Sequence, residues 1–100
     1  MSKEIVDEMI KLFPSNRIQS MLGASNLTRD DNHNSFAFRF KMCPKTNYFK
    51  MIYDEGQDLY NMEFYLIRNT KVAKVREFKG VSVEEVHMIF EKTTGLRLRL

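Results

Sequence analysis

The stretch Ser35-Phe36-Ala37-Phe38-Arg39-Phe40-Lys41-Met42 repeats an apolar side chain at every second position. The phenylalanines and Met42 fall on one side of an extended chain, and Ala37, Arg39 and Lys41 fall on the other. Because successive side chains of a β-strand point to opposite faces, this spacing predicts a half-buried strand with a basic outer face. The fold is therefore expected to contain a sheet with one buried and one exposed face.

The segment that follows predicts two more strands joined by a turn. The alternation breaks at residues 43–46, CPKT, and begins again at Tyr48–Tyr53. The sequence Asp54-Glu55-Gly56-Gln57 is typical of a hairpin turn, because glycine tolerates a positive φ. Alternation then continues over residues 59–67, with Met62 and Phe64 among the apolar positions.

A fourth strand is predicted after a second tight turn at Asn69-Thr70. It covers Val72–Phe78, and its alternation is weaker because apolar residues occur on both faces. This pattern favours a position near an edge of the sheet. The connections between the predicted strands are short, so neighbouring strands are expected to be antiparallel.

Residues 82–100, SVEEVHMIFEKTTGLRLRL, predict a helix followed by a strand. Ser82 and Glu85 have the spacing of a capping box, in which the two residues satisfy free backbone donors at the helix start. Gly95 is placed to end the helix in the left-handed conformation. The leucines of residues 96–100 alternate with arginines, so we expect this segment to join the core and its deletion to destabilise the fold. The predicted inward stripe of the helix consists of Val83, Val86, Ile89, Phe90 and Thr93.

The N-terminal part of the chain predicts two helices. Apolar residues of segment 5–13 cluster on one side of a helical projection, and Pro14 ends this first helix. A second, short helix is expected over residues 15–23, which begin with a capping serine and end with glycine. Residues 24–27 are compatible with a short strand, and the polar run 29–34 predicts an exposed loop.

These segments predict an α+β fold with an antiparallel β-meander of about five to six strands, two N-terminal helices and one C-terminal helix packed on one face. The 100 residues, 43% hydrophobic and 29% charged, are typical of a single globular domain, here residues 1–100.

The lone Cys43 favours a reducing compartment. Acidic residues near the N-terminus argue against a signal peptide, and no apolar run approaches the roughly 18 residues of a membrane span. We therefore expect a soluble protein of the cytoplasm.

Several segments of residues 22–100 resemble a family of small proteins encoded by bacteriophages and prophages. The resemblance is carried by the segments LGASN, NSFAFRF, NYFKMIY, DLYNMEF and IFEKTTGLRLRL, whereas the first 20 residues do not contribute. It implies a viral accessory protein working in the cytoplasm of a bacterial host. It implies no catalytic or binding residues, because the shared segments are sheet and helix-end patterns.

A catalytic site is not predicted. The strongest nucleophile candidate is Cys43 with His33 or His87, since a thiolate needs a neighbouring base or positive charge. Lys41 and Lys45 flank the cysteine, but no flanking glycines and no third orienting residue accompany it. Cys43 is therefore interpreted as a small residue at a strand end, and the protein as a non-enzyme.

The two acidic turns of the sequence are not predicted to bind a metal ion. Hard cations need several carboxylates that converge at short range, and the spacing DEGQD over residues 54–58 does not match a calcium loop. The other turn contains Asp30 and Asp31. The four glycines are far apart, so no phosphate-binding loop is predicted. No metal, cofactor or small-molecule substrate is expected.

Positive charge is arranged in bands along the chain. Residues 35–53 hold four basic and no acidic residues, 68–79 hold five basic and one acidic, and 54–67 between them hold four acidic and no basic residues. If the phenylalanines of residues 36–40 face the core, cations and tyrosines share the outer sheet face. Such a face can neutralise phosphates while bases stack on the rings. The candidate binding residues are Arg39, Lys41, Tyr48, Lys50, Tyr65, Lys74 and Arg76, with Arg97 and Arg99 as an extension.

Two classes of macromolecular partner are compatible with this surface. We expect a phage accessory protein that binds a protein, either by self-association as a homodimer or by modulating a host factor such as a nuclease, polymerase or defence complex. The alternative is a nucleic-acid-binding module that uses the basic and aromatic outer face. Cross-strand ion pairs of Glu63 would instead leave this face solvated. The apolar residues outside the inward stripes, which match the composition of an interface, are Tyr48, Ile52, Tyr65 and Met88.

Overall fold

The computed structural model describes residues 2–13, 23–41 and 43–95 of the chain. Within these ranges the chain forms two α-helices, five β-strands and two short 3-10 turns, labelled η. In chain order they are α1 (Ser2–Lys11), β1 (Ser25–Asp30), η1 (Asp31–His33), β2 (Ser35–Arg39), β3 (Tyr48–Asp54), β4 (Leu59–Arg68), β5 (Lys71–Val81), η2 (Val83–Glu85) and α3 (Val86–Thr94).

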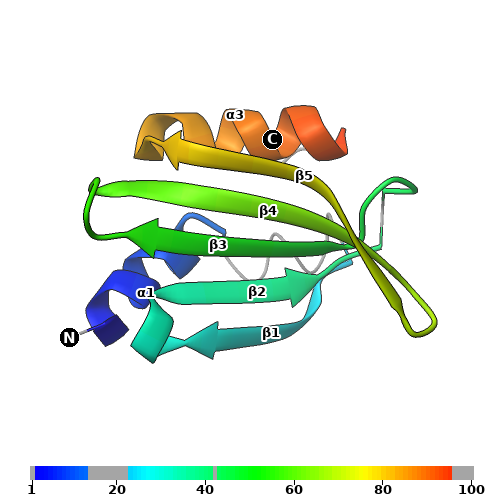
Figure 1. Cartoon of the computed structure of the whole chain (residues 1–100), viewed down its shortest axis with the longest axis horizontal. Coiled ribbons are helices and arrows are strands. Elements are labelled where there is room, and N and C mark those ends of the chain that lie inside the picture. Colours follow the sequence, from blue (N-terminus) through cyan, green and yellow to red (C-terminus); the bar gives the residue numbers. More distant parts are fainter. Residues whose placement is uncertain (1, 14–22, 42, 96–100) are drawn as a thin grey trace.

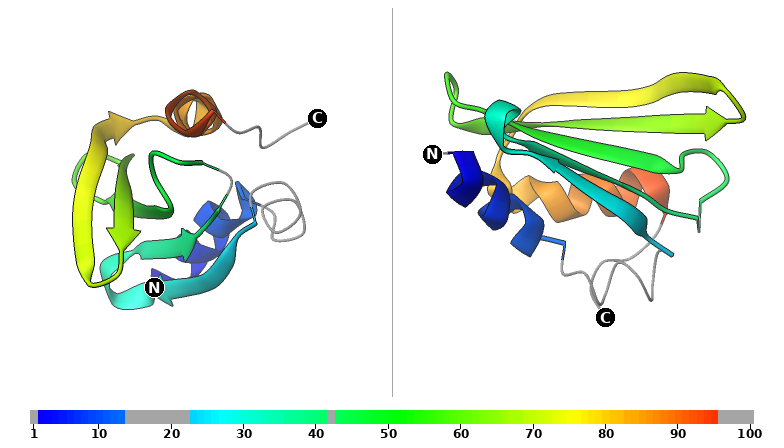
Figure 2. Two further views of the ribbon diagram at one scale, coloured as in Figure 1. Left: turned by 90° about the vertical axis from the view of Figure 1, so that its right-hand side faces the viewer. Right: turned by 90° about the horizontal axis from the view of Figure 1, so that it is seen from below.

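The five strands form one antiparallel sheet in the order β1-β2-β3-β4-β5 (Figure 1). Each strand pairs with its neighbours in sequence, because the connecting segments are too short for a crossover. The sheet is curved, and α1 and α3 lie on its concave side (Figure 2). The predicted α+β class and antiparallel meander are confirmed.

The N-terminal elements differ in part from the prediction. The strand expected at residues 24–27 is β1, which continues to Asp30 and so includes two residues of the expected loop. The turn follows directly, where the Asp30 carboxylate accepts hydrogen bonds from the backbone N–H groups of Asn32 (3.1 Å) and His33 (3.3 Å). The described part of the chain has one N-terminal helix, α1. The second helix expected over 15–23 falls largely on residues outside the described ranges, as does the whole strand expected over 96–100.

The C-terminal helix begins as predicted but with a different inward stripe. The Glu85 carboxylate accepts hydrogen bonds from the backbone N–H and the hydroxyl of Ser82, at 3.2 and 3.0 Å. Because the first turn is the tighter 3-10 form, Val83 lies outside the buried stripe and is 46% exposed. At the other end, Thr94 rather than Thr93 is buried. Gly95 ends the helix at φ 75°, as predicted.

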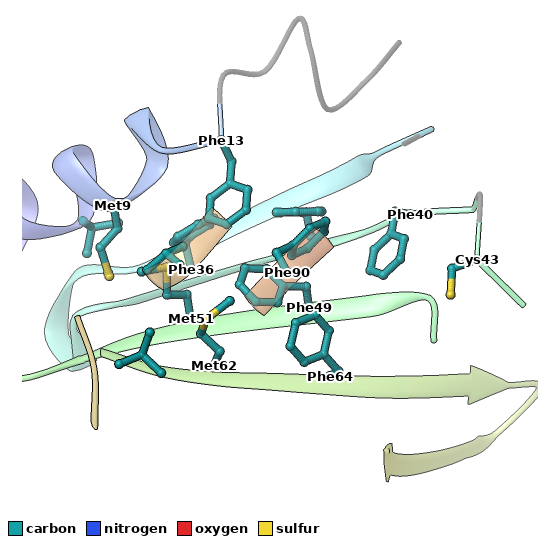
Figure 3. Packing of buried hydrophobic residues seen from close by; sticks show 14 residues of the cluster. Met9, Phe13, Phe36, Phe40, Cys43, Phe49, Met51, Met62, Phe64 and Phe90 are labelled. Atoms are coloured by element: carbon teal, nitrogen blue, oxygen red, sulfur yellow. The ribbon is translucent and has the colours of Figure 1, made fainter. Parts of the chain in front are cut away.

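Phenylalanine side chains fill most of the space between sheet and helices. Seven of the eight phenylalanines in the chain are buried. The Phe90 ring of α3 lies at the centre, with ring centroids 5.0 Å from Phe49, 5.3 Å from Phe13 and 5.7 Å from Phe64 (Figure 3). Such tilted and edge-to-face pairs are each worth about 0.5–1.5 kcal/mol beyond the burial of their area. The cluster therefore joins α3 and the residues that follow α1 to the middle of the sheet.

The segment between β2 and β3 is held against β4 by polar contacts. The Thr46 hydroxyl donates to the Tyr65 carbonyl at 2.7 Å. The Asn47 side chain donates to the Ile67 carbonyl at 2.9 Å and accepts from the Ile67 N–H at 2.8 Å. The predicted break in the strand pattern is therefore an ordered connection, and it places Lys45 beside the β4–β5 hairpin.

Candidate functional site

The strand register assembles four of the predicted binding residues in one row on the outer face of the sheet. Arg39 on β2 is opposite Tyr48 on β3, which is opposite Tyr65 on β4, which is opposite Lys74 on β5. The two tyrosine rings meet edge to face with centroids 5.9 Å apart, and the Lys74 Nζ lies 5.9 Å from the Tyr65 centroid. We call these four residues the outer-face row.

The next row on the same face carries acids as well as a base. It aligns Lys50 with Glu63 and Glu63 with Glu77. Lys74 Nζ lies 3.7 Å from a Glu63 carboxylate oxygen and 3.6 Å from a Glu77 carboxylate oxygen. The cross-strand ion pair foreseen for Glu63 is thus present. The carboxylates of Glu63 and Glu77 together offset the positive charge of Lys74 on this part of the face.

The Tyr65 hydroxyl is also engaged within the protein. It donates a hydrogen bond to the Glu63 carboxylate. Partial burial and this bond to an anion both disfavour the phenolate, so the pKa of Tyr65 lies well above its ordinary value. Of the outer-face row, Arg39 and Tyr48 are therefore the members with neither a carboxylate partner nor a hydroxyl bond to one within the described residues.

Three predicted cations on or beside this face, Arg39, Lys41 and Lys50, form no ion pair with any described residue. Lys50 projects from β3 in the row beside the tyrosines. Lys41 lies just beyond the end of β2 and, together with Arg39 and Asn47, lines a hollow of about 400 Å³. The free positive charge of the outer face therefore gathers at the β2–β3 side, away from Glu77.

Arg76 does not join the outer-face row. Phe64 is opposite Arg76 and Tyr65 is opposite Lys74, so Val75 is an additional residue on β5. This β-bulge leaves Arg76 on the face that Phe64 shares, toward the helices, whereas Lys74 stays on the outer face. Arg97 and Arg99, the remaining predicted cations, lie outside the described residues.

Beside the bulge, β5, α3 and the β2–β3 connection enclose a hollow of about 410 Å³, which we call the β5–α3 groove. Its apolar lining comes from Val75, Phe78 and Ile89. Its rim carries three cations, one from each of these elements, and no acidic residue of the described chain lines it. The three cations are Lys45, Arg76 and Lys92.

One edge of β5 is open in the described structure. The strand pairs with β4 alone, and its residues 71–77 are all exposed. Val72 and Val75 are 64% and 42% exposed, which is high for large apolar side chains on a sheet. An edge of this kind presents unpaired backbone N–H and C=O groups next to apolar side chains.

The sequence alone identified Arg76 but not the groove to which it belongs. Lys45, Lys92 and Val75 were not among the predicted binding residues. The available signal was the weak alternation of residues 72–78, since apolar residues on both faces are what a bulge in an exposed strand produces. The four apolar residues expected outside the inward stripes do not form one patch, because Met88 lies on α3, on the concave side of the sheet, whereas the other three lie on β3 and β4.

The residues considered for catalysis have separate structural contacts. Cys43 is 7% exposed and lies at the end of the phenylalanine cluster (Figure 3). His33 Nδ1 lies 2.7 Å from the Asp30 carboxylate, and this hydrogen bond lowers the pKa of Asp30. A His87 ring nitrogen hydrogen-bonds to the Leu12 carbonyl. Within the described residues, neither histidine hydrogen-bonds to the Cys43 thiol.

The acidic turn after β3 is likewise built from internal hydrogen bonds. The Tyr53 hydroxyl donates to the Asp58 carboxylate, which raises the pKa of Tyr53 to about 12. The Gly56 N–H donates to Asp54 at 3.0 Å, and the Asn34 side chain donates to Glu55 at 3.2 Å. Among the described residues, no group of three or more histidine, cysteine, aspartate or glutamate side chains is placed to hold a metal ion.

Comparison of the chain with known protein families, with curated proteins and with solved structures gives no match. None of the helices in the described ranges is long and apolar enough to cross a membrane.

The geometry of the described residues leaves two candidate binding surfaces. One is the β5–α3 groove with the open edge of β5, and the other is formed by the cations at the β2–β3 side of the outer face.

Proposed function

We propose that this protein is a non-enzymatic binding module whose partner is another protein, docked at the β5 edge and the β5–α3 groove. The observation that carries this proposal is the exposure of β5, an eleven-residue strand that has two exposed valines and that pairs on one edge only within the described residues. Strands of this kind are templates for pairing with a second chain. The groove beside the strand offers a concave apolar lining in which partner side chains can be buried.

The resemblance of residues 22–100 to small phage-encoded proteins supports an accessory role. In that role the partner is a protein of the host or of the phage, and the two meet in the host cytoplasm. Modulation of a host factor fits a small domain that exposes a pairing edge. Such a domain acts by binding to a strand or groove of its partner, and this requires no catalytic residue in the domain itself.

The outer face gives weaker support for a nucleic-acid partner. Lys74 is shared by two glutamates and Tyr65 is bonded to one of them, so half of the outer-face row is engaged within the protein. A phosphate backbone there would also meet the carboxylates of Glu63 and Glu77. The alternative is supported by Arg39, Lys41 and Lys50, which have no acidic partner among the described residues. Arg39 is opposite Tyr48 in the sheet, and Lys50 lines a hollow together with Tyr48.

Affinity capture with matched variants tests the proposed function. The tagged full-length protein, Val72→Lys plus Val75→Lys, and the outer-face control Arg39→Ala plus Lys50→Ala are each expressed in phage-infected bacteria. We expect one defined protein to be captured by the wild type and by the outer-face control, and to be lost from the β5 variant. Loss only in the outer-face control, together with salt-sensitive retention on DNA or RNA, would favour the nucleic-acid alternative instead.

A further inference from the structure

We infer that the partner segment at this site is an acidic, extended peptide that adds a strand to the β5 edge and places apolar side chains in the β5–α3 groove. This inference rests on the proposed function and specifies the chemistry of its partner.

The shape of the site calls for an extended chain. Val75, Arg76 and Phe78 of β5 line the groove, and β5 has no partner on its other edge among the described residues, so a segment that pairs with this edge lies next to the groove. In an added strand every second side chain points to the same face, which directs alternate residues toward Val75, Phe78 and Ile89. The bulge at Val75 brings this residue to the groove and turns Arg76 toward α3 rather than toward the outer face.

The charge of the site calls for acidic residues. Lys45, Arg76 and Lys92 surround the groove and form no ion pair within the described part of the chain. Glu77, the one acidic residue of β5, projects on the outer face and forms an ion pair with Lys74. Three cations around a partly apolar groove disfavour basic segments and favour carboxylates on the same face of the added strand as its apolar residues.

The same charges argue against a second copy of this chain as the occupant. β5 carries four basic residues and one acidic residue, so edge-to-edge pairing of two copies would bring two strongly positive strands together. Residues 96–100 carry two arginines and no acidic residue, so this segment of a second copy would also lack the carboxylates that the groove favours. Like charges directly opposite one another destabilise strand pairs.

The inference is tested by measuring the binding of labelled synthetic peptides to the full-length protein by fluorescence anisotropy. The probe is a labelled peptide of about eight residues, the length of an ordinary strand, in which every second residue is serine and the residues between are valine and glutamate in turn, so that valine and glutamate share one face. Three comparison ligands are the same peptide with lysine for glutamate, the same peptide with N-methylated alternate amides, and a single-stranded oligonucleotide. The groove variant is Arg76→Glu plus Lys92→Glu, and the matched control with the same charge change is Arg39→Glu plus Lys50→Glu on the outer face.

We expect the acidic peptide to bind the wild type and the outer-face control with similar affinity. It should bind the groove variant at least about tenfold more weakly, because two attractive charge contacts become repulsive. The lysine and N-methylated peptides should lose binding by a similar factor. Absence of acidic-peptide binding at low salt would overturn the inference. So would equal binding of the N-methylated peptide, or displacement by the oligonucleotide together with loss of binding in the outer-face control.

Failure of this inference can be distinguished from failure of the proposed function. If the acidic peptide does not bind but a captured protein still depends on Val72 and Val75, the protein-binding function stands and the acidic segment is wrong. If neither the peptide nor any captured protein depends on β5, both are wrong. Circular dichroism and thermal melting of each variant show whether a loss of binding reflects loss of the fold.

Discussion

At the scale of single residues, Tyr65 links the outer face to the stability of the sheet. Its hydroxyl donates to Glu63, and both its partial burial and this bond disfavour the phenolate, so the pKa of Tyr65 is higher in the folded than in the unfolded chain. A group with a raised folded pKa stabilises the fold fully below its unfolded pKa, here 10.0, and that contribution is lost as the pH rises toward the folded pKa.

We therefore predict that the urea midpoint of the wild type falls as the pH rises above about 10, and that Tyr65→Phe shows a smaller fall over the same range. Below that range the Phe variant is less stable, because Glu63 loses a donor. Urea unfolding at several pH values measures both effects. Tyr48→Phe is the control, since no hydrogen bond of its hydroxyl within the described residues ties it to a carboxylate. Parallel pH profiles for the wild type and Tyr65→Phe would contradict the assignment.

The sequence predicted the residues of the outer face better than those of the groove. Arg39, Tyr48 and Tyr65 could be placed together because strand alternation fixes which face a side chain takes once the strands are known. Arg76 could not, because one additional residue in β5 changes the face of everything beyond it. No local residue preference marks Val75 as that additional residue. Its position is set by how β5 fits against β4 and α3.

At the scale of elements, the start of the last helix is held by a contact that the sequence predicted. Glu85 accepts from both the N–H and the hydroxyl of Ser82, whereas the adjacent Glu84 is exposed without a hydrogen bond to a described residue. We predict that Glu85→Ala lowers the free energy of unfolding by about 0.5–2 kcal/mol, the usual range for loss of an N-terminal cap. Glu84→Ala should change it by less than about 0.5 kcal/mol. Chemical denaturation of the pair provides the measurement, and equal effects would show that the capping box contributes nothing.

Element boundaries followed the sequence where turn and cap chemistry is local. Ser82, Gly95 and the Asp30 turn behave as their side chains or backbone freedom require. The first turn of the last helix is different, because a 3-10 turn was not visible in the spacing of the apolar residues and Val83 is exposed as a result. The open edge of β5 was expected from its weak alternation, but the groove depends on α3 lying beside it, which is a matter of tertiary packing.

At the scale of the whole molecule, one side chain connects α3 to three strands and to the residues that follow α1. The Phe90 ring contacts Phe13 at the end of the N-terminal segment, Phe38 on β2, Phe49 on β3 and Phe64 on β4. The groove also depends on this contact, because α3 supplies Ile89 and Lys92 to its lining. Packing in the core and the geometry of the proposed binding site are therefore coupled through the position of α3.

We predict that Phe90→Ala lowers the free energy of unfolding by about 3–5 kcal/mol, since a fully buried ring is removed from a close-packed cluster. Phe90→Leu should cost less, because it retains much of the buried volume, and Met88→Ala on the exposed side of the same helix should change the stability by less than about 0.5 kcal/mol. Urea unfolding of the three variants gives these differences. Phe90→Leu should stay folded and should also weaken binding of the acidic peptide, because α3 can shift once the ring contacts are lost. A Phe90→Leu variant that is destabilised but binds the peptide as the wild type does would show that the groove does not depend on the core beneath it.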